Sequence, residues 1–430
     1  MENSPSQSEA RPTQSEAFKV FAKNGLLSFG GPAAQISLMH RLLVEENKWL
    51  SEKQFLNALS FCMLLPGPEA MQLATYSGWR LHGIRGGLIA GLLFVLPGAF
   101  VVLALAMIYV LFGNVPLVEA LFLGVKAAVL IIVVEALLRV SKRALKGRAH
   151  WIIAALSFIG IFFFSLPYPL IVLAAALFGF FFSTGEASEG EVAAPITTTF
   201  RQTTTTIAVG LLLWLGPIIL IDWFLHGSIL ATIGSFFSKL AVVTFGGAYA
   251  VLAYMGQDVV THFGWLNAGE MMDGLGLAET TPGPLILVTE FVGFIAAYRD
   301  GGIWLGLAGA VVTLWATFMP CFLWIFAGAP YIDWIATQPR LSGALQAITA
   351  AVVGVILNLS IWFGLHVLFK TVTLEKTGWL TLWKPELASI DWRVAVLSVL
   401  CGVLLLKFHW GIVKVLALSA ALGWVLTSVL

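Results

Sequence analysis

The sequence predicts an all-α, polytopic membrane protein of about thirteen transmembrane helices, arranged as two inverted repeats of six helices joined by one extra helix. Composition, segment length and internal repetition predict this class. Of the 430 residues, 59% are hydrophobic and only 11% are charged, and no water-soluble fold buries that much apolar surface. The apolar residues form segments of roughly 20 residues, the length of a helix that crosses a bilayer. The second half of the chain also repeats motifs of the first.

The chain begins with a polar tail at residues 1–16, which we expect to be disordered because it lacks the apolar core of a signal peptide. A polar, threonine-rich stretch at 184–205 is predicted to be a solvated linker. The first repeat then covers 17–183, a connecting transmembrane helix 206–228, and the second repeat 229–430. The thirteen apolar segments lie at 17–38, 55–79, 84–112, 116–139, 150–166, 168–183, 206–225, 230–254, 270–298, 302–328, 341–369, 391–407 and 411–429.

The two repeats are recognised by aligning the chain with itself. With a shift of 216 residues, positions 23–68 align with 239–284 without a gap, and 13 of the 46 pairs are identical. Seven predicted spans separate equivalent positions. Because seven is odd, the repeats should lie upside down relative to each other, an arrangement typical of secondary transporters.

Basic residues predict the orientation in the membrane. Positively charged loops stay in the cytoplasm, and the connection at 139–150 contains Arg139, Lys142, Arg143, Lys146 and Arg148. This places the N-terminus in the cytoplasm of a bacterial inner-membrane protein. A re-entrant hairpin at 17–38 would move the basic connection outside, which argues against that path. The loop at 370–390 is external on this count although it contains three lysines.

Glycine and proline motifs interrupt four of the apolar segments. Glycine tolerates a positive φ and proline cannot donate a backbone hydrogen bond, so both break a helix. A half-helix that begins after a break presents unpaired N–H groups and a partial positive charge, which together bind anions. We therefore expect an anion site near the bilayer midplane, although such residues also kink helices merely for packing. The site residues are Gly30, Gly31, Pro32, Pro66, Gly67 and Pro68, with Gly246, Gly247, Pro282, Gly283 and Pro284 in the second repeat.

Three kinds of polar side chain accompany the breaks. Lys23 and Lys239 occupy the same repeat position; they either flank the path of an anion or extend to the membrane interface. A deeper lysine, Lys126, is expected to form a structural ion pair with Glu119 or Glu135 of the same helix.

Carboxyl groups and glutamines lie near the same motifs. A carboxyl group surrounded by hydrocarbon can exchange a proton near neutral pH, which makes Glu69, Glu279 and Glu290 candidates for proton coupling. Alternatively, Glu69 is a charge at a helix N-terminus and Glu279 is in water. Gln35 and Gln72 are possible donors to a substrate oxygen, but neither recurs in the second repeat.

Several functions are excluded or disfavoured. With 24 basic and 23 acidic residues the net charge is +1, so the chain has no basic field to bind nucleic acid. Its three cysteines are far apart and predict neither disulfides nor a metal site. Hydrolase, metalloprotease and nucleotide-binding motifs are absent from the sequence. We therefore predict that the protein is not an enzyme and has no cofactor.

The motifs resemble those of the chromate transporter family, in its long, two-domain form. The matching residues are Ser28-Phe29-Gly30-Gly31-Pro32, Trp49, Leu65-Pro66-Gly67-Pro68 and Phe94-Val95-Leu96-Pro97-Gly98, with Thr244-Phe245-Gly246-Gly247, Thr281-Pro282-Gly283-Pro284 and Phe322-Leu323-Trp324-Ile325-Phe326 in the second copy. This resemblance implies efflux of chromate from the bacterial cytoplasm, with the glycine and proline motifs taking part in transport.

The resulting hypothesis is a secondary transporter that exports chromate by rocking of two inverted repeats around the breaks. Its expected partners are chromate, sulfate as a competing anion, the lipid bilayer and a second copy of the chain in a homodimer. Two alternatives stay open at this point. One is a transporter of sulfate or another oxyanion, imported with protons; the other is a membrane assembly factor that transports nothing.

Overall fold

The computed structural model describes residues 12–113, 115–182, 199–245, 248–336 and 338–429. The described chain is mostly helical, and this confirms the predicted class of all-α, polytopic membrane protein. Within the described ranges, five segments are long and apolar enough to cross a membrane: α4, α5, α8, the segment from η3 to η4, and α14. Shorter apolar helices accompany them. Gly246, Gly247 and most of the predicted tail and linker lie outside the described residues.

The first repeat and the connecting helix contain eight α-helices and one π-helical turn. They are α1 (Gln14–Leu26), α2 (Gly31–His40), η1 (Arg41–Glu46), α3 (Glu52–Leu64), α4 (Glu69–Phe112), α5 (Pro116–Ala144), α6 (Arg148–Phe162), α7 (Tyr168–Phe182) and α8 (Phe200–Phe224).

The second repeat follows the same order and adds a short β-hairpin. Its elements are α9 (Ile229–Val243), α10 (Ala248–Gln257), η2 (Asp258–His262), α11 (Ala268–Thr280), η3 (Leu285–Leu287), α12 (Val288–Gly328), η4 (Ala329–Tyr331), α13 (Ile332–Ala336), α14 (Pro339–Leu368), β1 (Val372–Thr377), β2 (Leu380–Pro385), η5 (Leu387–Ser389), α15 (Trp392–Gly402), η6 (Val403–Lys407) and α16 (Ile412–Val429).

Capping residues start two helices earlier than predicted. Thr13 and Glu16 form a capping box, so α1 begins at Gln14 and the last residues of the expected tail are helical. Thr199 and Gln202 form the same box at the start of α8. Residues 200–205, expected to belong to the linker, are therefore the first turns of α8.

The longest helices of the two repeats bend at equivalent turns. Gly83 in α4 and Gly302 in α12 have φ values of +63° and +77°, a conformation that glycine adopts without strain. Each turn divides its helix into a short arm and a long arm, at 69–81 and 84–112 in α4, and at 288–300 and 303–328 in α12.

The short arm of α12 returns alongside α11. Arg299, at the end of the arm, donates hydrogen bonds to the Trp265 carbonyl and to the Glu270 carboxylate, both at the start of the segment. In one straight helix, residues 270 and 299 would be about 44 Å apart at 1.5 Å per residue. Gly274 of α11 also faces Phe291 of α12. The segment is therefore a helical hairpin whose tip is the break at residues 281–284.

The other three broken segments also fold back. Phe236 of α9 contacts Tyr254 of α10 and Trp265 beyond it, with ring centroids 6.1 and 5.7 Å apart. Lys23 Nζ of α1 lies 3.7 Å from Glu46 Oε2 at the end of η1. In the same way α3 packs against α4. We predicted these segments as straight spans, and the structure differs because each tip reverses the chain.

Four hairpins and nine crossings follow from this path. The crossings are the long arm of α4, α5, α6, α7, α8, the long arm of α12, α14, α15 and α16. Five of them separate equivalent positions, again an odd number, so the inversion of the repeats is retained. Two hairpins precede the basic loop between α5 and α6, so this loop stays on the side of the N-terminus.

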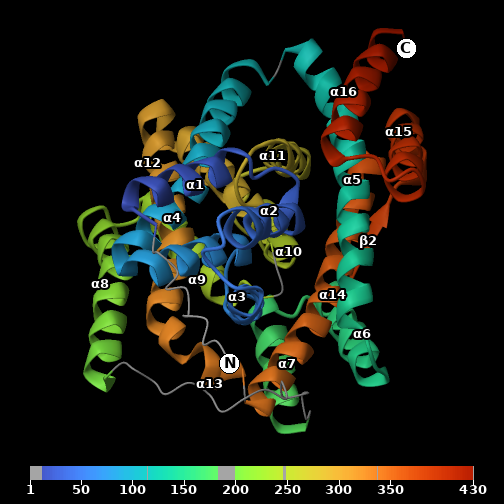
Figure 1. The fold of residues 1–430 in the computed structure, drawn as a ribbon. Coiled ribbons are helices and arrows are strands. Elements are labelled where there is room, and N and C mark those ends of the chain that lie inside the picture. The colour runs from blue at the N-terminus through green and yellow to red at the C-terminus, as the bar shows by residue number, and fades with distance from the viewer. Residues whose placement is uncertain (1–11, 114, 183–198, 246–247, 337, 430) are drawn as a thin grey trace.

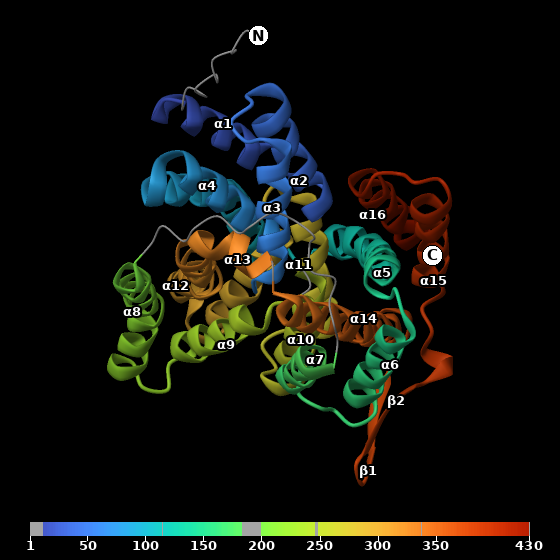
Figure 2. The ribbon, with the colours of Figure 1, turned by 60° about the horizontal axis from the view of Figure 1, so that its bottom comes forward.

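The hairpins lie between two groups of crossing helices (Figures 1 and 2). α8 stands at one edge of the molecule, while α15 and α16 stand at the opposite edge. Only 11% of the apolar window of α8 is buried, against 72% for α14. α8 is thus exposed to lipid, and α14 belongs to the core, where it packs on α6, α7 and α5.

The β-hairpin was not predicted. β1 and β2 pair antiparallel in register Val372 with Pro385 through Thr377 with Leu380, and Gly378 at φ +62° closes the turn. The hairpin extends away from the helices in Figure 2. It occupies the loop at 370–390 that we expected on the outer side.

We predict that Lys48→Cys and Lys146→Cys react from the same side of the membrane, and His226→Cys from the other. Lys48 lies between the two hairpins of the first repeat, Lys146 lies between α5 and α6, and His226 lies between α8 and α9. The measurement is labelling with a membrane-impermeant maleimide in intact cells and in inside-out vesicles. The wild type is the control, since its three cysteines are buried. If Lys48→Cys instead reacts together with His226→Cys, the four segments cross the membrane as straight spans.

Candidate anion site at the hairpin tips

The four tips meet through backbone hydrogen bonds between the repeats. Gly67 N–H donates to the Thr244 carbonyl oxygen at 2.8 Å, and Gly283 N–H donates to the Ser28 carbonyl oxygen at 2.9 Å. Each bond joins the first tip of one repeat to the second tip of the other. Exchanging the repeats converts one bond into the other, so the crossing has approximate two-fold symmetry.

Glycine and proline have the roles expected of them at the tips. Gly30, Gly67 and Gly283 have φ values of +87°, +122° and +90°, which disfavour any residue with a side chain. Pro32 lies in the first turn of α2, and Pro68 is the N-cap of α4. Proline is tolerated there because the missing N–H would have no partner within the helix.

The tips are also closely packed. A Cβ atom at Gly67 would lie 2.7 Å from Gln72 Nε2 and 2.9 Å from Cys321 Sγ. In the equivalent place of the other repeat, a Cβ atom at Gly98 would overlap the Pro282 carbonyl oxygen. The crossing therefore has no room for larger residues at these positions.

Hydroxyl groups satisfy the carbonyl groups at the ends of the first arms. Ser28 Oγ donates to the Asn24 carbonyl oxygen at 2.6 Å, and Thr244 Oγ1 donates to the Leu240 carbonyl oxygen at 2.5 Å. These two residues are equivalent in the repeats. The acceptors of the helix C-termini thus have internal partners at the tips.

Two glutamines of the first repeat hold the tips. Gln35 Nε2 donates to the Gly283 carbonyl at 2.6 Å and to the Ser28 carbonyl at 3.4 Å. Gln72 Nε2 donates to the Pro66 carbonyl at 2.7 Å. Both amide groups had been considered as donors to a substrate, but in the structure they bind the protein backbone.

The N–H groups at the tips have far fewer partners than the carbonyl groups. α2, α4 and η3 begin at a tip without a side-chain cap. In contrast α1, α3, α8 and α11, which begin away from the tips, each have a capping box. The uncapped N-termini leave donors and partial positive charge at the crossing, the arrangement that attracts an anion.

The predicted lysines lie apart from this crossing. Lys23 has a half-exposed side chain that pairs with Glu46, and Lys239 is exposed. Neither lysine has a described contact with the tips. Their proposed role beside the path of an anion stays a prediction.

The three predicted carboxyl groups lie in different surroundings. Glu290 is 1% exposed, and its Oε2 has no hydrogen-bond partner among the described residues. Glu279 is buried and accepts a hydrogen bond of 2.6 Å from the Tyr249 hydroxyl. It is therefore not in water, the alternative that we considered. Glu69 is half-buried in the first turn of α4.

Lys126 pairs with a residue that we did not predict. Its Nζ lies 3.4 Å from Asp273 Oδ2, whereas Glu135 pairs with Arg139. The expected ion pair within one helix is therefore wrong. Asp273 lies within a predicted apolar span, and this signal could have identified it, but its partner is 147 positions away in sequence and could not be predicted from spacing.

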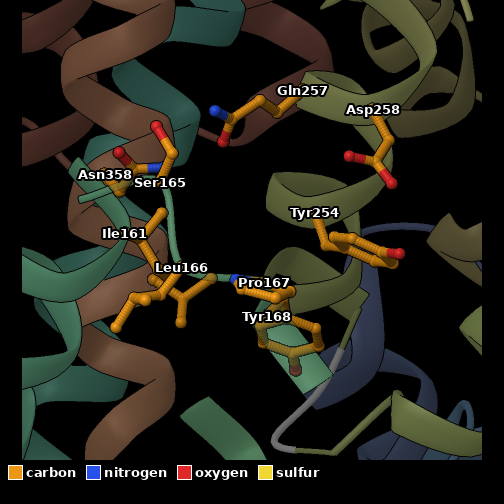
Figure 3. A pocket seen from close by; sticks show the side chains of 10 residues that line it. Ile161, Ser165, Leu166, Pro167, Tyr168, Tyr254, Gln257, Asp258 and Asn358 are labelled. Atoms are coloured by element: carbon orange, nitrogen blue, oxygen red, sulfur yellow. The ribbon is translucent and has the colours of Figure 1, made fainter. Parts of the chain in front are cut away.

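A small cavity of about 80 Å³ lies away from the tips (Figure 3). Its polar lining includes the Asp258 carboxyl group and the Tyr254 hydroxyl, with Gln257, Ser165 and Asn358 nearby. A carboxylate in so small a space repels anions, so this cavity is a poor anion site. In the described part of the chain, no three His, Cys, Asp or Glu residues are close enough together to hold a metal ion.

The fold and the tips define a class of protein. Two repeats that bring interrupted helices together at the centre of a membrane protein are the architecture of a secondary transporter. The chain belongs to the chromate transporter family, because the family described as "Chromate transporter" matches residues 15–180 and 231–424. One matched segment lies in each repeat.

Similar proteins have been named in three bacteria. The chromate transport protein of Pseudomonas aeruginosa is 34% identical over 355 residues, 79% of this chain and 79% of the relative. That of Cupriavidus metallidurans is 32% identical over 339 residues, 78% and 79% of the two chains. A probable chromate transport protein of Synechococcus elongatus is 30% identical over 389 residues, 90% and 94%. No solved structure matches this chain.

We predict that Gln35→Met lowers the stability of the protein by about 1 to 3 kcal/mol, the usual effect of leaving a buried polar group without its partner. The substitution keeps the size of the side chain but removes the donor to the Gly283 and Ser28 carbonyl groups. The measurement is thermal unfolding in detergent, followed by size-exclusion chromatography. Gln346→Met is the matched control, because Gln346 is an exposed glutamine of α14. Equal stability of both variants would mean that Gln35 does not hold the tips.

Proposed function

We propose that this protein is a secondary transporter that exports chromate from the cytoplasm by alternating access around the hairpin tips. The observation that carries the proposal is the set of uncapped helix N-termini at the crossing of the tips. The names of the relatives, chromate transport proteins, support the choice of substrate. The membrane is the bacterial cytoplasmic membrane, with the N-terminus in the cytoplasm.

In this proposal the backbone binds the substrate. The first N–H groups of α2 and α4, near Gly31 and Glu69, donate to the oxygens of the dianion. The partial charge of each N-terminus, about half a positive charge, compensates the substrate charge without a buried cation. Lys23 and Lys239 attract the anion toward the path. The remaining tip residues, from Gly30 to Pro284, fix the donors in place.

The bonds between the tips provide the moving contact. Gly67 bonds to Thr244 and Gly283 bonds to Ser28, so each bond crosses from one repeat to the other. Rocking of one repeat against the other breaks or shifts these two bonds. Because the bonds are equivalent by symmetry, the inward-open and outward-open states exchange the same kind of contact.

The membrane potential favours export. A dianion that leaves a cell with a negative interior gains about 4.6 kcal/mol per 100 mV, at about 2.3 kcal/mol per charge. Export therefore needs no further energy source, whereas import would require coupling to another ion. Glu69, Glu279 and Glu290 are the proton-binding candidates near the tips if such coupling exists.

Sulfate is the competing substrate. Backbone N–H groups bind the oxygens of any tetrahedral dianion, and the described tips contain no group that would distinguish the central atom. We therefore expect sulfate to inhibit chromate transport partially.

We predict that inside-out vesicles containing the protein accumulate radiolabelled chromate, and that a membrane potential, positive inside the vesicle, increases this uptake. Excess unlabelled sulfate should reduce the uptake. Gly67→Leu should lower the rate at least 10-fold, since any side chain at Gly67 meets Gln72 and Cys321.

Gly83→Leu is the matched control for this measurement. Gly83 also has a positive φ, but no other group lies within 4 Å of an added Cβ, so the backbone strain is similar and the tip is untouched. Uptake equal to that of empty vesicles, with inserted wild-type protein, would exclude chromate transport. Equal activity of the two leucine variants would move the path away from the tips.

A further inference from the structure

A charged cluster joins the repeats at some distance from the tips. Asp273 of α11 is 3% exposed and accepts a hydrogen bond of 2.8 Å at Oδ2 from the Tyr109 hydroxyl of α4. Lys126 Nζ of α5 lies 3.4 Å from the same oxygen. The second oxygen, Oδ1, has no hydrogen-bond partner among the described residues. A buried carboxylate with one free oxygen is unusual in a structural ion pair.

The cluster lines a large cavity. The cavity has a volume of about 560 Å³, and Tyr109, Lys126 and Asp273 all contribute to its wall. The other walls come from the base of the hairpin formed by α11 and α12, and from the segments on either side of the β-hairpin. In the topology derived above, all these segments end on the side opposite the N-terminus. The cavity is therefore the outer vestibule.

The cluster is absent from the equivalent place in the other repeat. With the repeat shifts of 216 and 223 residues, Asp273 corresponds to Asn57, Lys126 to Thr349 and Tyr109 to Ile332. None of these three side chains titrates near neutral pH. The backbone of the tips is symmetric, but this charge pair exists only on the outer side.

The remaining charges around Asp273 are largely neutralised. Glu270 of α11 pairs with Arg299 of α12, and Asp391 pairs with Arg393. The other titratable groups of the wall are Glu119 of α5, Tyr298 of α12, His366 of α14 and Lys370. The contact between Lys126 and Asp273 is thus the ion pair whose opening would change the charge facing the cavity.

We propose that Tyr109, Lys126 and Asp273 form a second, proton-dependent anion site in the outer vestibule. A proton from cavity water binds the free Oδ1 of Asp273, and the neutral carboxyl group keeps its hydrogen bond from Tyr109. Lys126 loses its charged partner, and its ammonium group binds an oxyanion in the cavity. By linkage, anion binding then increases proton binding by the same factor. The site does not depend on which anion the tips carry.

The test measures proton uptake when an anion binds to the purified wild-type protein in detergent. Sulfate is the probe, because it takes up no protons itself near neutral pH, whereas chromate does. Added to weakly buffered protein with a pH indicator, sulfate should cause uptake of up to one proton per chain. Asp273→Asn should abolish this uptake, while Glu119→Gln, which changes another carboxyl group of the same wall, should retain it.

Two further results would overturn the proposal. One is a wild type that takes up no protons with sulfate; the other is an Asp273→Asn variant that takes up as many as the wild type. If Asp273→Asn is not monodisperse in detergent, Lys126→Met replaces it and should likewise abolish the uptake. Chromate transport is measured separately in vesicles, so a failed transport assay with intact proton uptake would contradict the proposed function but leave this site standing.

Discussion

Hydrocarbon forces every backbone N–H and C=O group to find a partner within the protein, and this constraint determines the centre of the molecule. Breaking four helices at membrane depth exposes many such groups at once. The two bonds from Gly67 to Thr244 and from Gly283 to Ser28 answer this need by joining the tips across the repeats. Because no tip is satisfied alone, the four hairpins must meet, and the surrounding helices are arranged around that meeting point.

Partners are distributed unequally between the two ends of the broken helices. At the C-termini, Ser28 and Thr244 bond to carbonyl groups of the preceding turn, and Gln35 and Gln72 bind carbonyl groups of the tips. At the N-termini, α2, α4 and η3 have no side-chain cap. The result is a centre that is rich in unpaired donors, which binds an anion better than a cation. Electrostatic selection by sign therefore requires no charged residue at the tips.

The sequence predicted the breaks but not the direction of the chain after them. Gly30, Gly67 and Gly283 recur in register, so their positions could be predicted from the repeat alone. Composition is the same whether an apolar segment of 25 residues crosses the membrane or returns at its middle, which is why the hairpins were predicted as straight spans. Contacts such as Lys126 with Asp273 depend on how the two repeats are placed in space, and local spacing carries no information about that.

Backbone symmetry and side-chain asymmetry have separate consequences. Two inverted repeats with equivalent tip contacts make the inward-open and outward-open states similar in free energy, so neither state is a trap. Such symmetry alone gives no preference for either side of the membrane. The preference must come from residues that break the repeat, and Asp273, whose counterpart is Asn57, is such a residue at the outer vestibule. In this protein the tips would carry the anion, while the unequal side chains would set the conditions under which it enters or leaves.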